Sequence, residues 1–405
     1  MIHSKIKHCR ASQKKDLIKV CSFPDMYLTG TFPKKNQIVP KTPVEIVFSK
    51  SSKLLQLNHN YDEKKLYGPN YGYRSGLNPV MVNHLRQKYF KLKKDIKLKK
   101  DDCILDIGSN DSTFLNFFKN TKNYGVDPTI KKYSKFYKEN TIKLPFTFEK
   151  SFKKLKKKKF KLISAIAMFY DIKEPVEFLK KIKTILNTDG IFHIEIAYLP
   201  EIIKTFSYDT FCQEHYEYYS LISLNYLIEK VDLKIFDFGF NKINGGSIWL
   251  NIGHKNAKIK KNNQKLLRQI KLEKKNKIDK ASTYKKYFHK VKIHAKNLKK
   301  LIQNLNKKNK KVSGIGASTK GNVLLQLSRL ENNNLNKVYD INPYKFGKYT
   351  PCPRIKIENE TKIKIDQPDY LLVLIWHFDK FIINKIKKQF KKIKLIIPFP
   401  KIKII

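Results

Sequence analysis

The stretch ILDIGSNDSTFL, residues 104–115, is a hydrophobic run that passes into Asp106-Ile107-Gly108. Such a run predicts a buried strand that ends in a glycine turn, where backbone N–H groups and a helix N-terminus can approach a ligand. A dinucleotide-binding turn needs three glycines in the pattern G-x-G-x-x-G, so that a pyrophosphate can lie close to the backbone. Here the turn reads G-S-N-D-S, and Ser112 stands where a glycine is expected. We therefore predict a Rossmann-like turn for a ligand without a pyrophosphate.

A second predicted strand, NYGVDP, ends at Asp127. An acidic residue in that place accepts hydrogen bonds from the two hydroxyls of a ribose. The Asn and Asp side chains of the first turn suit a ligand with an amino-acid tail, and the two features together indicate S-adenosylmethionine. The predicted cofactor-binding residues are Asp106, Gly108, Ser109, Asn110, Asp127 and Pro128. A plain Rossmann-like turn is the alternative, and a φ above zero at Ser112 would cost roughly 1 kcal/mol.

Outward from this motif, strands and helices alternate between residues 103 and about 255. The expected strands are CILDIG, NYGVDP, KLISAIAMFYDI and IFHIEIAYL, with LKIFDFGF and SIWLNIGH as a closing antiparallel pair. Strands that alternate with helices at this spacing predict a mostly parallel sheet covered on both faces. A second α/β unit begins at residue 311, with its own glycine turn ending at Gly316 and its own acidic strand end at Asp340. The expected fold class is α/β, with two Rossmann-like units in tandem.

Four segments follow from this pattern. Residues 1–90 are Pro-punctuated and should form a small irregular domain, residues 91–256 the cofactor domain, and residues 311–405 a C-terminal Rossmann-like domain. Between them, residues 257–310 read as one long connecting helix, because apolar residues recur every three or four positions. These are Tyr284, Tyr287, Val291, Ala295, Leu298, Ile302 and Leu305. The other faces are nearly all Lys and Asn and should be solvated.

The chain has 405 residues and a formal charge of +51. Such a charge favours polyanions, because neutralised phosphates release their counterions. Only six of the 85 basic residues are Arg, however, and recognition of phosphates and bases favours the Arg fork. The lysines are spread along the whole chain beside abundant Asn and Ile, as a compositional bias would give. We therefore expect no nucleic-acid partner despite the charge.

Membrane and secretion signals are missing from the sequence. The longest apolar runs are far below the roughly 20 residues of a membrane span. The N-terminus MIHSKIKHCRASQKK has no apolar segment of the kind found in signal peptides. The five cysteines form no CxxC pair, so free thiols are expected. These features predict a cytoplasmic protein with no membrane partner.

Several longer motifs carry a family resemblance. LDIGSNDST with GVDP, AMFYDIKEPVEFL, YDTFCQEHYEYYSL and NGGSIWLNI, in this order, resemble the sugar C-methyltransferases that act on nucleotide-linked 4-keto-6-deoxyhexoses. GASTKGNVLLQ, YDINPYKFGKYTPCPRI, PDYLLVLIWHF and IIPFP resemble the C-terminal domain of that family. The likeness covers essentially the whole chain. It implies a class I methyltransferase sheet, S-adenosylmethionine as cofactor, and a nucleotide-sugar substrate in deoxysugar or surface-polysaccharide biosynthesis.

The reaction that the resemblance implies needs a base. A carbon next to a ketone becomes nucleophilic once its proton is removed, and the enolate can then attack the methyl sulfonium. His215 is the expected base, because His is the side chain best matched to proton transfer at neutral pH. Its alternative is a capping histidine in an aromatic-rich loop. By resemblance, Glu214 and a tyrosine of NYGYRSG, Tyr71 or Tyr73, also line the reacting sugar.

The resemblance also indicates a substrate region around two further turns. Its predicted residues are Asn244, Gly245, Gly316, Ser318, Lys320 and Asn322. In the second α/β unit, a helix N-terminus and a Lys would favour the diphosphate of a nucleotide sugar. A relic Rossmann turn that only packs a helix on a strand is the alternative there, and a simple hairpin turn is the alternative at Asn244-Gly245-Gly246.

The family's first domain usually binds a structural zinc through two C-x-x-C pairs. The matching stretches here are CRAS, Cys9–Ser12, and SKSS, Ser49–Ser52, so one thiolate of four is retained. Structural zinc needs about four Cys or His ligands, and we therefore predict no metal in this domain. Its fold must then depend on apolar packing.

Three rival functions stay open. A methyltransferase acting on RNA or DNA would suit the charge, but the chain lacks the Asn/Asp-Pro-Pro-Tyr tetrad, and NPYK at residues 342–345 comes closest. Methyl transfer to an oxygen of a similar sugar is the second. A drifted, non-catalytic relative that only binds the cofactor is the third, although the retained Glu214-His215 pair argues against it.

Overall fold

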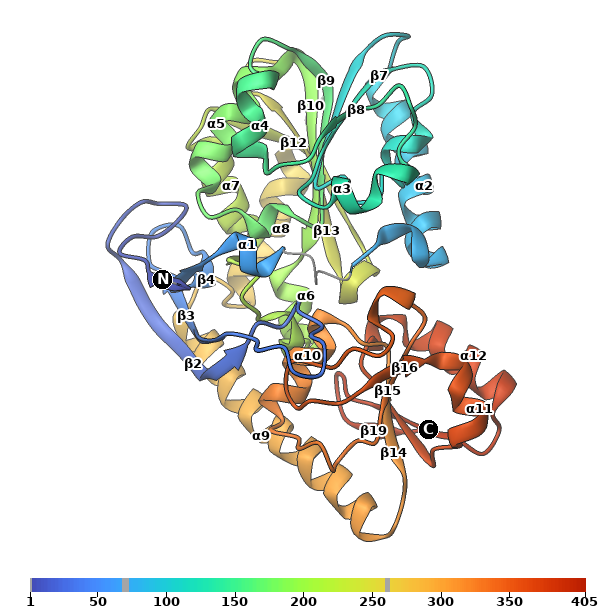
Figure 1. The fold of residues 1–405 in the computed structure, drawn as a ribbon. Coiled ribbons are helices and arrows are strands. Elements are labelled where there is room, and N and C mark those ends of the chain that lie inside the picture. Colours follow the sequence, from blue (N-terminus) through green and yellow to red (C-terminus); the bar gives the residue numbers. More distant parts are fainter. Residues whose placement is uncertain (1, 68–72, 259–262) are drawn as a thin grey trace.

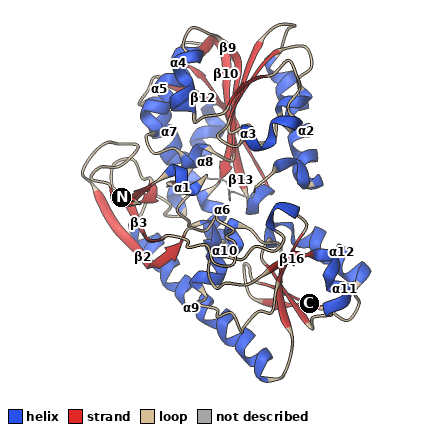
Figure 2. Ribbon diagram, in the orientation of Figure 1, coloured by secondary structure: helices blue, strands red, loops and turns tan. Residues whose placement is uncertain are grey.

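The computed structural model describes residues 2–67, 73–258 and 263–405. Its largest sheet has seven strands in the order β12-β13-β10-β9-β6-β7-β8. These strands are β6 (Cys103–Ile107), β7 (Lys122–Val126), β8 (Ile142–Leu144), β9 (Phe160–Ile166), β10 (Leu186–Ala197), β12 (Leu233–Asn241) and β13 (Ser247–His254). Strand β13 is antiparallel to β10 and β12, and the other neighbours are parallel (Figure 2). The predicted closing antiparallel pair is thus confirmed.

Helices cover both faces of this sheet (Figure 1). Helix α2 (Pro79–Ile96) lies on one face, where Asn78 caps the Val80 N–H and Pro79 occupies the first turn. Helices α4 (Phe148–Leu155), α5 (Pro175–Ile185) and α7 (Leu221–Glu229) lie on the other. Their apolar side chains and those of the strands form a separate core on each face. Burial of both faces explains why the parallel strands read as almost continuous apolar runs.

The N-terminal segment, expected to be irregular, contains a four-stranded sheet. Its order is β11-β4-β3-β2, with β2 (Leu17–Tyr27), β3 (Lys41–Ser49), β4 (Leu55–Leu57) and β11 (Glu217–Tyr218), and a small ladder joins β1 (His3–Lys5) to β5 (His59–Tyr61). Pro24 lies inside β2 where the register shifts between Phe23 and Met26, because a proline fits a strand only at an edge or a bulge. This bulge interrupts the alternation of apolar and polar residues, so the sequence does not predict the strand.

The two stretches that resemble zinc-binding pairs fold into matching turns. Cys9 N–H donates to the Lys14 carbonyl and Ser49 N–H to the Leu54 carbonyl, each 2.9–3.0 Å long. In each turn the fourth residue donates its N–H to the side chain of the first, from Ser12 to Cys9 Sγ and from Ser52 to Ser49 Oγ. Cys9 Sγ and Ser52 Oγ then meet at 3.2 Å. The contact between Cys9 and Ser52 thus joins the two turns.

The C-terminal unit holds a six-stranded sheet in the order β16-β15-β14-β17-β18-β19. Its strands are β14 (Val312–Ile315), β15 (Val338–Asp340), β16 (Ile357–Asn359), β17 (Tyr370–Val373), β18 (Lys394–Ile397) and β19 (Lys403–Ile404), with helices α10 (Thr319–Leu327), α11 (Ile363–Asp366) and α12 (Asp379–Gln389). Only β19 is antiparallel to its neighbour. The expected second Rossmann-like unit is therefore present.

The single connecting helix predicted for residues 257–310 is wrong, because the structure has two helices there. Helix α8 (Asn263–Lys275) packs against α7, and α9 (Ala281–Lys307) starts after a break. At the break Lys277 has a φ of 57°, which no helix accommodates. Buried Glu273 at the end of α8 accepts the N–H groups of Leu221 and Ile222 at 2.7 and 2.9 Å and so caps α7.

The apolar stripe of α9 joins the N-terminal sheet to the C-terminal unit. Its predicted members are buried in one core with residues from both of these parts. Phe288 meets Phe23 edge-on at 5.6 Å, and Tyr284 lies 5.4 Å from Phe48. Figure 1 shows α9 running along both. The predicted stripe is thus confirmed, and it packs against both the N-terminal sheet and the C-terminal unit.

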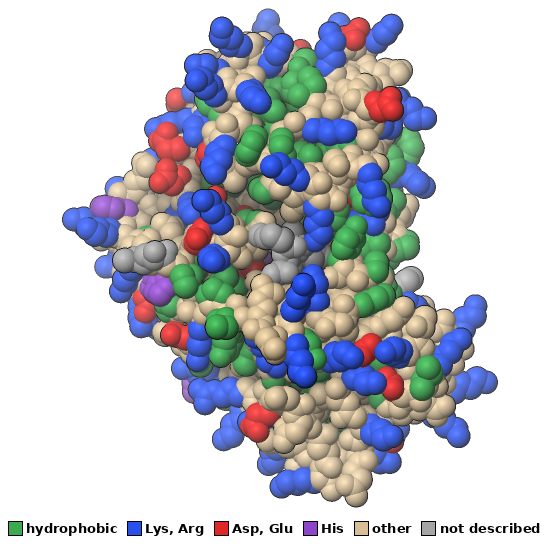
Figure 3. Space-filling model, viewed as in Figure 1, with side chains coloured by type: hydrophobic (Ala, Val, Ile, Leu, Met, Phe, Trp, Pro, Cys, Tyr) green, Lys and Arg blue, Asp and Glu red, His purple; other side chains and the backbone are tan. Residues whose placement is uncertain are grey.

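The surface charge is dispersed. On the face shown in Figure 3, Lys and Arg are scattered over all parts of the molecule and interspersed with acidic and apolar side chains. This distribution matches a compositional bias better than one basic stripe. Among the helices of the described ranges, none combines the length and apolar character needed to cross a membrane.

Candidate active site

A cavity of about 330 Å³ opens at the carboxyl ends of β6, β7, β9 and β10. All six residues predicted to bind the cofactor line it: Asp106, Gly108, Ser109, Asn110, Asp127 and Pro128. Two residues predicted for the acceptor, Tyr73 and Asn244, line it as well. Ligands of open parallel sheets bind at this edge, and the volume lies within the usual range for small-molecule sites. The structure therefore gathers the sequence motif around one pocket.

The first turn adopts left-handed backbone at three positions. Gly108 has a φ of 78°, and a Cβ there would lie 2.9 Å from Met168 Cγ, so only glycine fits. Asn110 has a φ of 49° and Ser112 a φ of 66°. The condition stated for strain at Ser112, a φ above zero, is therefore met. Its hydroxyl partly offsets the strain by donating to Asn116 Oδ1 at 3.0 Å.

Two buried carboxyl groups face the cavity. Burial raises the pKa of Asp106 to about 7; the Ser164 hydroxyl, 2.6 Å away, opposes the shift, and the charge of Asp127 adds to it. Burial also raises the pKa of Asp127, against hydrogen bonds from Thr129 and Asn110. The Asn110 N–H reaches Asp127 Oδ2 at 3.0 Å. A hydrogen bond thus connects the glycine turn to Asp127, the carboxylate expected to bind ribose hydroxyls. This arrangement suits the polar part of S-adenosylmethionine.

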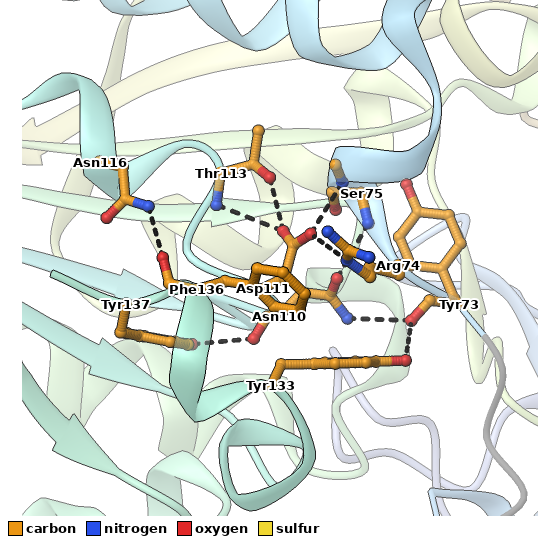
Figure 4. Close-up of polar contacts among 11 residues, drawn as sticks. Tyr73, Arg74, Ser75, Asn110, Asp111, Thr113, Asn116, Tyr133, Phe136 and Tyr137 are labelled. Atoms are coloured by element: carbon orange, nitrogen blue, oxygen red, sulfur yellow. Dashed lines mark hydrogen bonds and ion pairs between the residues drawn. The ribbon is translucent and has the colours of Figure 1, made fainter. Parts of the chain in front are cut away.

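Residues 73–76 form a clamp on the far side of the turn (Figure 4). The Ser75 N–H donates to Asn110 Oδ1 at 3.0 Å, and the Gly76 N–H donates to Asp111 Oδ2 at 2.9 Å. Arg74 Nε also donates to Asp111 Oδ2 at 3.0 Å, and its guanidinium lies 3.7 Å above the ring of Phe136. The clamp ties the N-terminal segment to the cofactor loop.

The clamp fixes the backbone of Tyr73. Its carbonyl accepts hydrogen bonds from Asn110 Nδ2 at 3.3 Å and from the Tyr133 hydroxyl at 3.1 Å (Figure 4). The Tyr73 side chain is about half exposed and lines the cavity. Its rival Tyr71 lies outside the described residues. Of the two predicted tyrosines, Tyr73 is the one that the structure places at the cavity.

His215 lies just behind the cavity wall. Its Nδ1 contacts the Thr210 carbonyl oxygen at 2.8 Å, and since a carbonyl can only accept, Nδ1 carries the proton and Nε2 the lone pair. Its ring meets the ring of Tyr170 edge-on at 4.4 Å. Burial lowers the pKa of His215 to about 4, the Thr210 bond opposes the shift, and the charge of Lys320 adds to it. The imidazole is therefore neutral at pH 7.

Glu214 joins the site to the N-terminal sheet. Its Oε2 accepts the Thr29 hydroxyl at 2.9 Å, while its Oε1 is buried with no hydrogen-bond partner among the described residues. Burial raises the pKa of this carboxyl. A Cβ on Gly30 would lie 2.2 Å from Oε1. Neither Glu214 nor His215 belongs to the lining of the cavity itself.

The residues predicted for the nucleotide lie at the joint between the two α/β units. Lys320 Nζ donates to the Asn244 carbonyl at 2.7 Å, and Asn322 Nδ2 donates to the Thr29 carbonyl at 2.7 Å. Ser318 caps α10 by accepting the Gly321 N–H at 2.9 Å. Gly316, with a φ of 84°, packs against Ile375. Of this group, only Asn244 lines the cavity.

Gly245 belongs to the same joint, in the turn between β12 and β13. Its φ is 91°, and a Cβ there would lie 2.9 Å from the Trp376 indole. That indole donates its N–H to Asp209 Oδ2 at 2.7 Å. Lys320 and Trp376 of the C-terminal unit therefore bind the turn at Asn244 and the loop at Asp209 of the cofactor domain.

Sequence reasoning missed several acidic residues of the cavity wall, among them Glu195 and Asp171. Glu195 lies near the carboxyl end of β10. It accepts hydrogen bonds from His84 Nε2 at 2.7 Å and Asn241 Nδ2 at 2.9 Å, and it pairs with Lys88 at 2.6 Å. Burial raises the pKa of Glu195, but His84 and Lys88 lower it by more, and the resulting pKa is about 2. An acidic residue near the carboxyl end of a strand was the signal that could have found Glu195.

The metal prediction concerns Cys9, Ser12, Ser49 and Ser52. The structure brings these four positions together, all of them buried. One thiolate and three hydroxyls do not make a zinc site, so the residues present do not fit the metal. Nor does any other group of three or more His, Cys, Asp or Glu residues in the described ranges have the arrangement of a metal site.

Sequence models of two protein families match the chain. Residues 81–237 match a methyltransferase domain, and residues 242–400 match the C-methyltransferase C-terminal domain. With the sheet order and cavity described above, these matches define the class: the protein is an S-adenosylmethionine-dependent methyltransferase with a class I sheet, and it carries the C-terminal domain of C-methyltransferases.

At the level of individual proteins, the chain is similar over its whole length to C-methyltransferase NovU of Streptomyces niveus. The two are 26% identical over 410 residues, which cover 99% of this chain and 97% of the relative. Solved structures with a similar part include an S-adenosylmethionine-dependent methyltransferase from Clostridium acetobutylicum ATCC 824, with 15% identity over 43% of this chain and 92% of that one and a TM-score of 0.34. Another is the plantazolicin methyltransferase BpumL in complex with SAH, with 14% identity over 43% and 84% and a TM-score of 0.35.

Proposed function

We propose that the protein transfers the methyl group of S-adenosylmethionine to a carbon next to the ketone of a nucleotide-linked keto-deoxysugar. The support is threefold: the family motifs in the sequence, the C-methyltransferase C-terminal domain over residues 242–400, and full-length similarity to a C-methyltransferase. The bound cofactor would supply an electrophilic methyl group. The acceptor carbon must then become nucleophilic, which requires loss of a proton.

The observation that carries this proposal is the hydrogen-bonded tautomer of His215. Its Nδ1–H is held by the Thr210 carbonyl at 2.8 Å, so Nε2 presents its lone pair. A pKa of about 4 keeps this nitrogen unprotonated at neutral pH. The ring packs on Tyr170, whose neighbour Asp171 lines the cofactor cavity. In the proposal, Nε2 removes the proton from the acceptor carbon, and the electron pair moves to the ketone oxygen.

Other residues position the acceptor in this proposal. The Tyr73 hydroxyl and Glu214 lie toward the sugar. Asn244 and Gly245 form the turn beside it. At the nucleotide end, the residues are those that hold the joint to the C-terminal unit, namely Gly316, Ser318, Lys320 and Asn322. Substrate would then bind between the two α/β units, in the cytoplasm.

The test is incubation with isotope-labelled S-adenosylmethionine and a panel of 4-keto-6-deoxy nucleotide sugars, followed by mass spectrometry. We expect a product heavier by one methyl group. A His215→Ala variant should lose about 10²–10⁴-fold in kcat, the usual contribution of a positioned base. His289→Ala, on the exposed side of α9, is the matched control and should not change the rate. Formation of product by His215→Ala at the wild-type rate would contradict the assignment of the base.

A further inference from the structure

Asp171 is a cavity residue to which the proposed reaction so far gives no part. It ends a short 3-10 turn, Phe169–Asp171, which follows β9 after Ala167 and Met168. Like these two residues, it lines the cavity. Its Oδ1 is shielded from solvent and has no hydrogen-bond partner among the described residues. A buried carboxyl oxygen without a partner is costly, and its presence calls for an explanation. A ligand in the cavity would supply one.

The surroundings of Asp171 favour the neutral acid. Burial raises its pKa well above the ordinary value; the Tyr67 hydroxyl opposes the shift, and the charge of nearby Glu214 adds to it. The other titratable groups that interact with it are Tyr170, Cys212, Tyr216 and Glu217. Lys173, two residues further on, is paired with Glu63 at 3.0 Å. A neutral carboxylic acid differs from a carboxylate in one respect that matters here: it can donate a hydrogen bond.

Asp171 follows Tyr170 in the chain, and Tyr170 contacts the proposed base. Tyr170 packs its ring on His215 at 4.4 Å, and its carbonyl accepts the Tyr216 N–H at 2.8 Å. The backbone of residues 170–171 is therefore bonded to the segment that carries His215. A group that can donate a hydrogen bond thus lines the cavity, and a group that can accept a proton lies behind it on a segment bonded to the same backbone.

We propose that Asp171 is a second catalytic residue, which donates a hydrogen bond from its neutral carboxyl group to the ketone oxygen of the acceptor as the enolate forms. This inference rests on the proposed function. His215 Nε2 takes the proton from the acceptor carbon, and the C–H electron pair becomes a C=C bond while the C=O pair moves to oxygen. The Asp171 proton stays on Asp171 and stabilises that oxygen. When the carbon attacks the methyl group, the C–S bond breaks, its electron pair remains on sulfur, and the ketone is restored. Environments that keep an acid neutral for such a purpose are known in enzymes that form enolates.

The test compares Asp171→Asn and Asp171→Ala, because an amide can still donate a hydrogen bond and a methyl group cannot. Two readouts are needed: methyl transfer at saturating S-adenosylmethionine, and exchange of the acceptor's proton for deuterium in D₂O with S-adenosylhomocysteine bound. We expect Asp171→Ala to lower both rates by about 10²–10³-fold, as for other oxyanion donors. Asp171→Asn should retain most of the wild-type rate in both assays. The exposed Asp189→Asn is the control.

The pH profile gives a readout that a purely structural role would not change. Wild-type activity should fall at high pH as Asp171 ionises and loses its donor, and this fall should be missing in Asp171→Asn. If the wild type exchanges the proton and Asp171→Ala reacts at the wild-type rate, the proposed role of Asp171 is wrong, while the enolate chemistry still holds. A weaker affinity for S-adenosylmethionine with unchanged saturated turnover would overturn it as well, since Asp171 would then bind the cofactor. Equal slowness of Asp171→Asn and Asp171→Ala would also contradict it. Failure of the wild type to exchange the proton would instead contradict the enolate chemistry itself.

Discussion

Asp106 shows how the fold changes the charge of a single residue. Its carboxyl group is buried at the end of β6, beside the charge of Asp127, and its pKa is about 7. In the folded protein this carboxyl group therefore keeps its proton up to about pH 7. In the unfolded chain it would already be ionised above its ordinary pKa. Between these two pKa values the folded state binds more protons than the unfolded state, so stability falls as pH rises through this range.

This linkage makes a prediction for Asp106→Asn without cofactor. Asn keeps an acceptor for the Ser164 hydroxyl but removes the ionisable group. The variant and the wild type should be equally stable at pH 4, and the variant should become more stable by roughly 1–4 kcal/mol at pH 7 and above. Urea unfolding between pH 4 and 8 measures the difference. A difference that does not change with pH would contradict the shift.

At this scale the sequence predicts the motif but not the individual environments. Asp106, Gly108 and Asp127 follow from a strand, a turn and a second strand end. Asp171 does not, because its importance comes from a buried oxygen without a hydrogen-bond partner among the described residues, and burial is a property of the folded chain. The left-handed backbone of Ser112 could be stated only as a condition, since a serine does not reveal its φ.

Among the elements, the two turns that resemble a zinc site are the most informative. They keep the same backbone hydrogen bonds although three of the four expected thiolates are hydroxyls. Cys9, Ala11 and Leu54 belong to the core of the cofactor domain, so apolar packing contributes to holding the turns in place. The turns therefore do not depend on a metal for their shape.

We predict that the triple variant Ser12→Cys, Ser49→Cys, Ser52→Cys binds zinc. Cys9 Sγ and Ser52 Oγ are already 3.2 Å apart, and four thiolates in such a pair of turns would give a tetrahedral site. Titration with Co²⁺ should show the absorption of tetrahedral thiolate coordination, and zinc should raise the melting temperature. Adding Cys9→Ser to the triple variant should weaken both effects strongly. A triple variant that binds no more metal than the wild type would show that the turns are too far apart.

The elements themselves were mostly accessible to sequence reasoning. Strands buried on both faces, the antiparallel closing pair and the apolar stripe of α9 all follow from periodicity. The break between α8 and α9 did not, because Lys277, which has a φ of 57°, is an ordinary helix former, and no glycine or proline marks the break in the sequence. The N-terminal sheet was missed because Pro24 and its bulge interrupt the alternation of β2.

In the whole molecule, three parts meet at Thr29-Gly30. The Thr29 hydroxyl bonds Glu214 of the cofactor domain, and its carbonyl accepts from Asn322 of the C-terminal unit. A Cβ on Gly30 would lie 2.2 Å from Glu214 Oε1 and 3.5 Å from Thr319 Oγ1. Only a residue without a side chain allows the three parts to approach this closely. Such long-range contacts leave no periodic pattern in the sequence.

Gly30→Ala should therefore displace Glu214 and lower kcat, by at least about tenfold, which corresponds to 1.4 kcal/mol in the barrier. The loss in melting temperature should be small, because the atom that must move is the end of a side chain. The control is a double-mutant cycle with Glu214→Ala: once the carboxyl group is removed, Gly30→Ala should have little further effect. Additive losses in the cycle would contradict the proposed contact.

Carbon methylation by way of His215 is the central claim, and the bond that the methyl group forms tests it most directly. The measurement is carbon NMR of the product made by the wild-type enzyme from ¹³C-methyl-labelled S-adenosylmethionine and a nucleotide-linked keto-deoxysugar. A labelled methyl coupled to a sugar carbon next to the ketone is the predicted result. A labelled methyl bonded to oxygen would contradict the account, because transfer to oxygen needs no enolate.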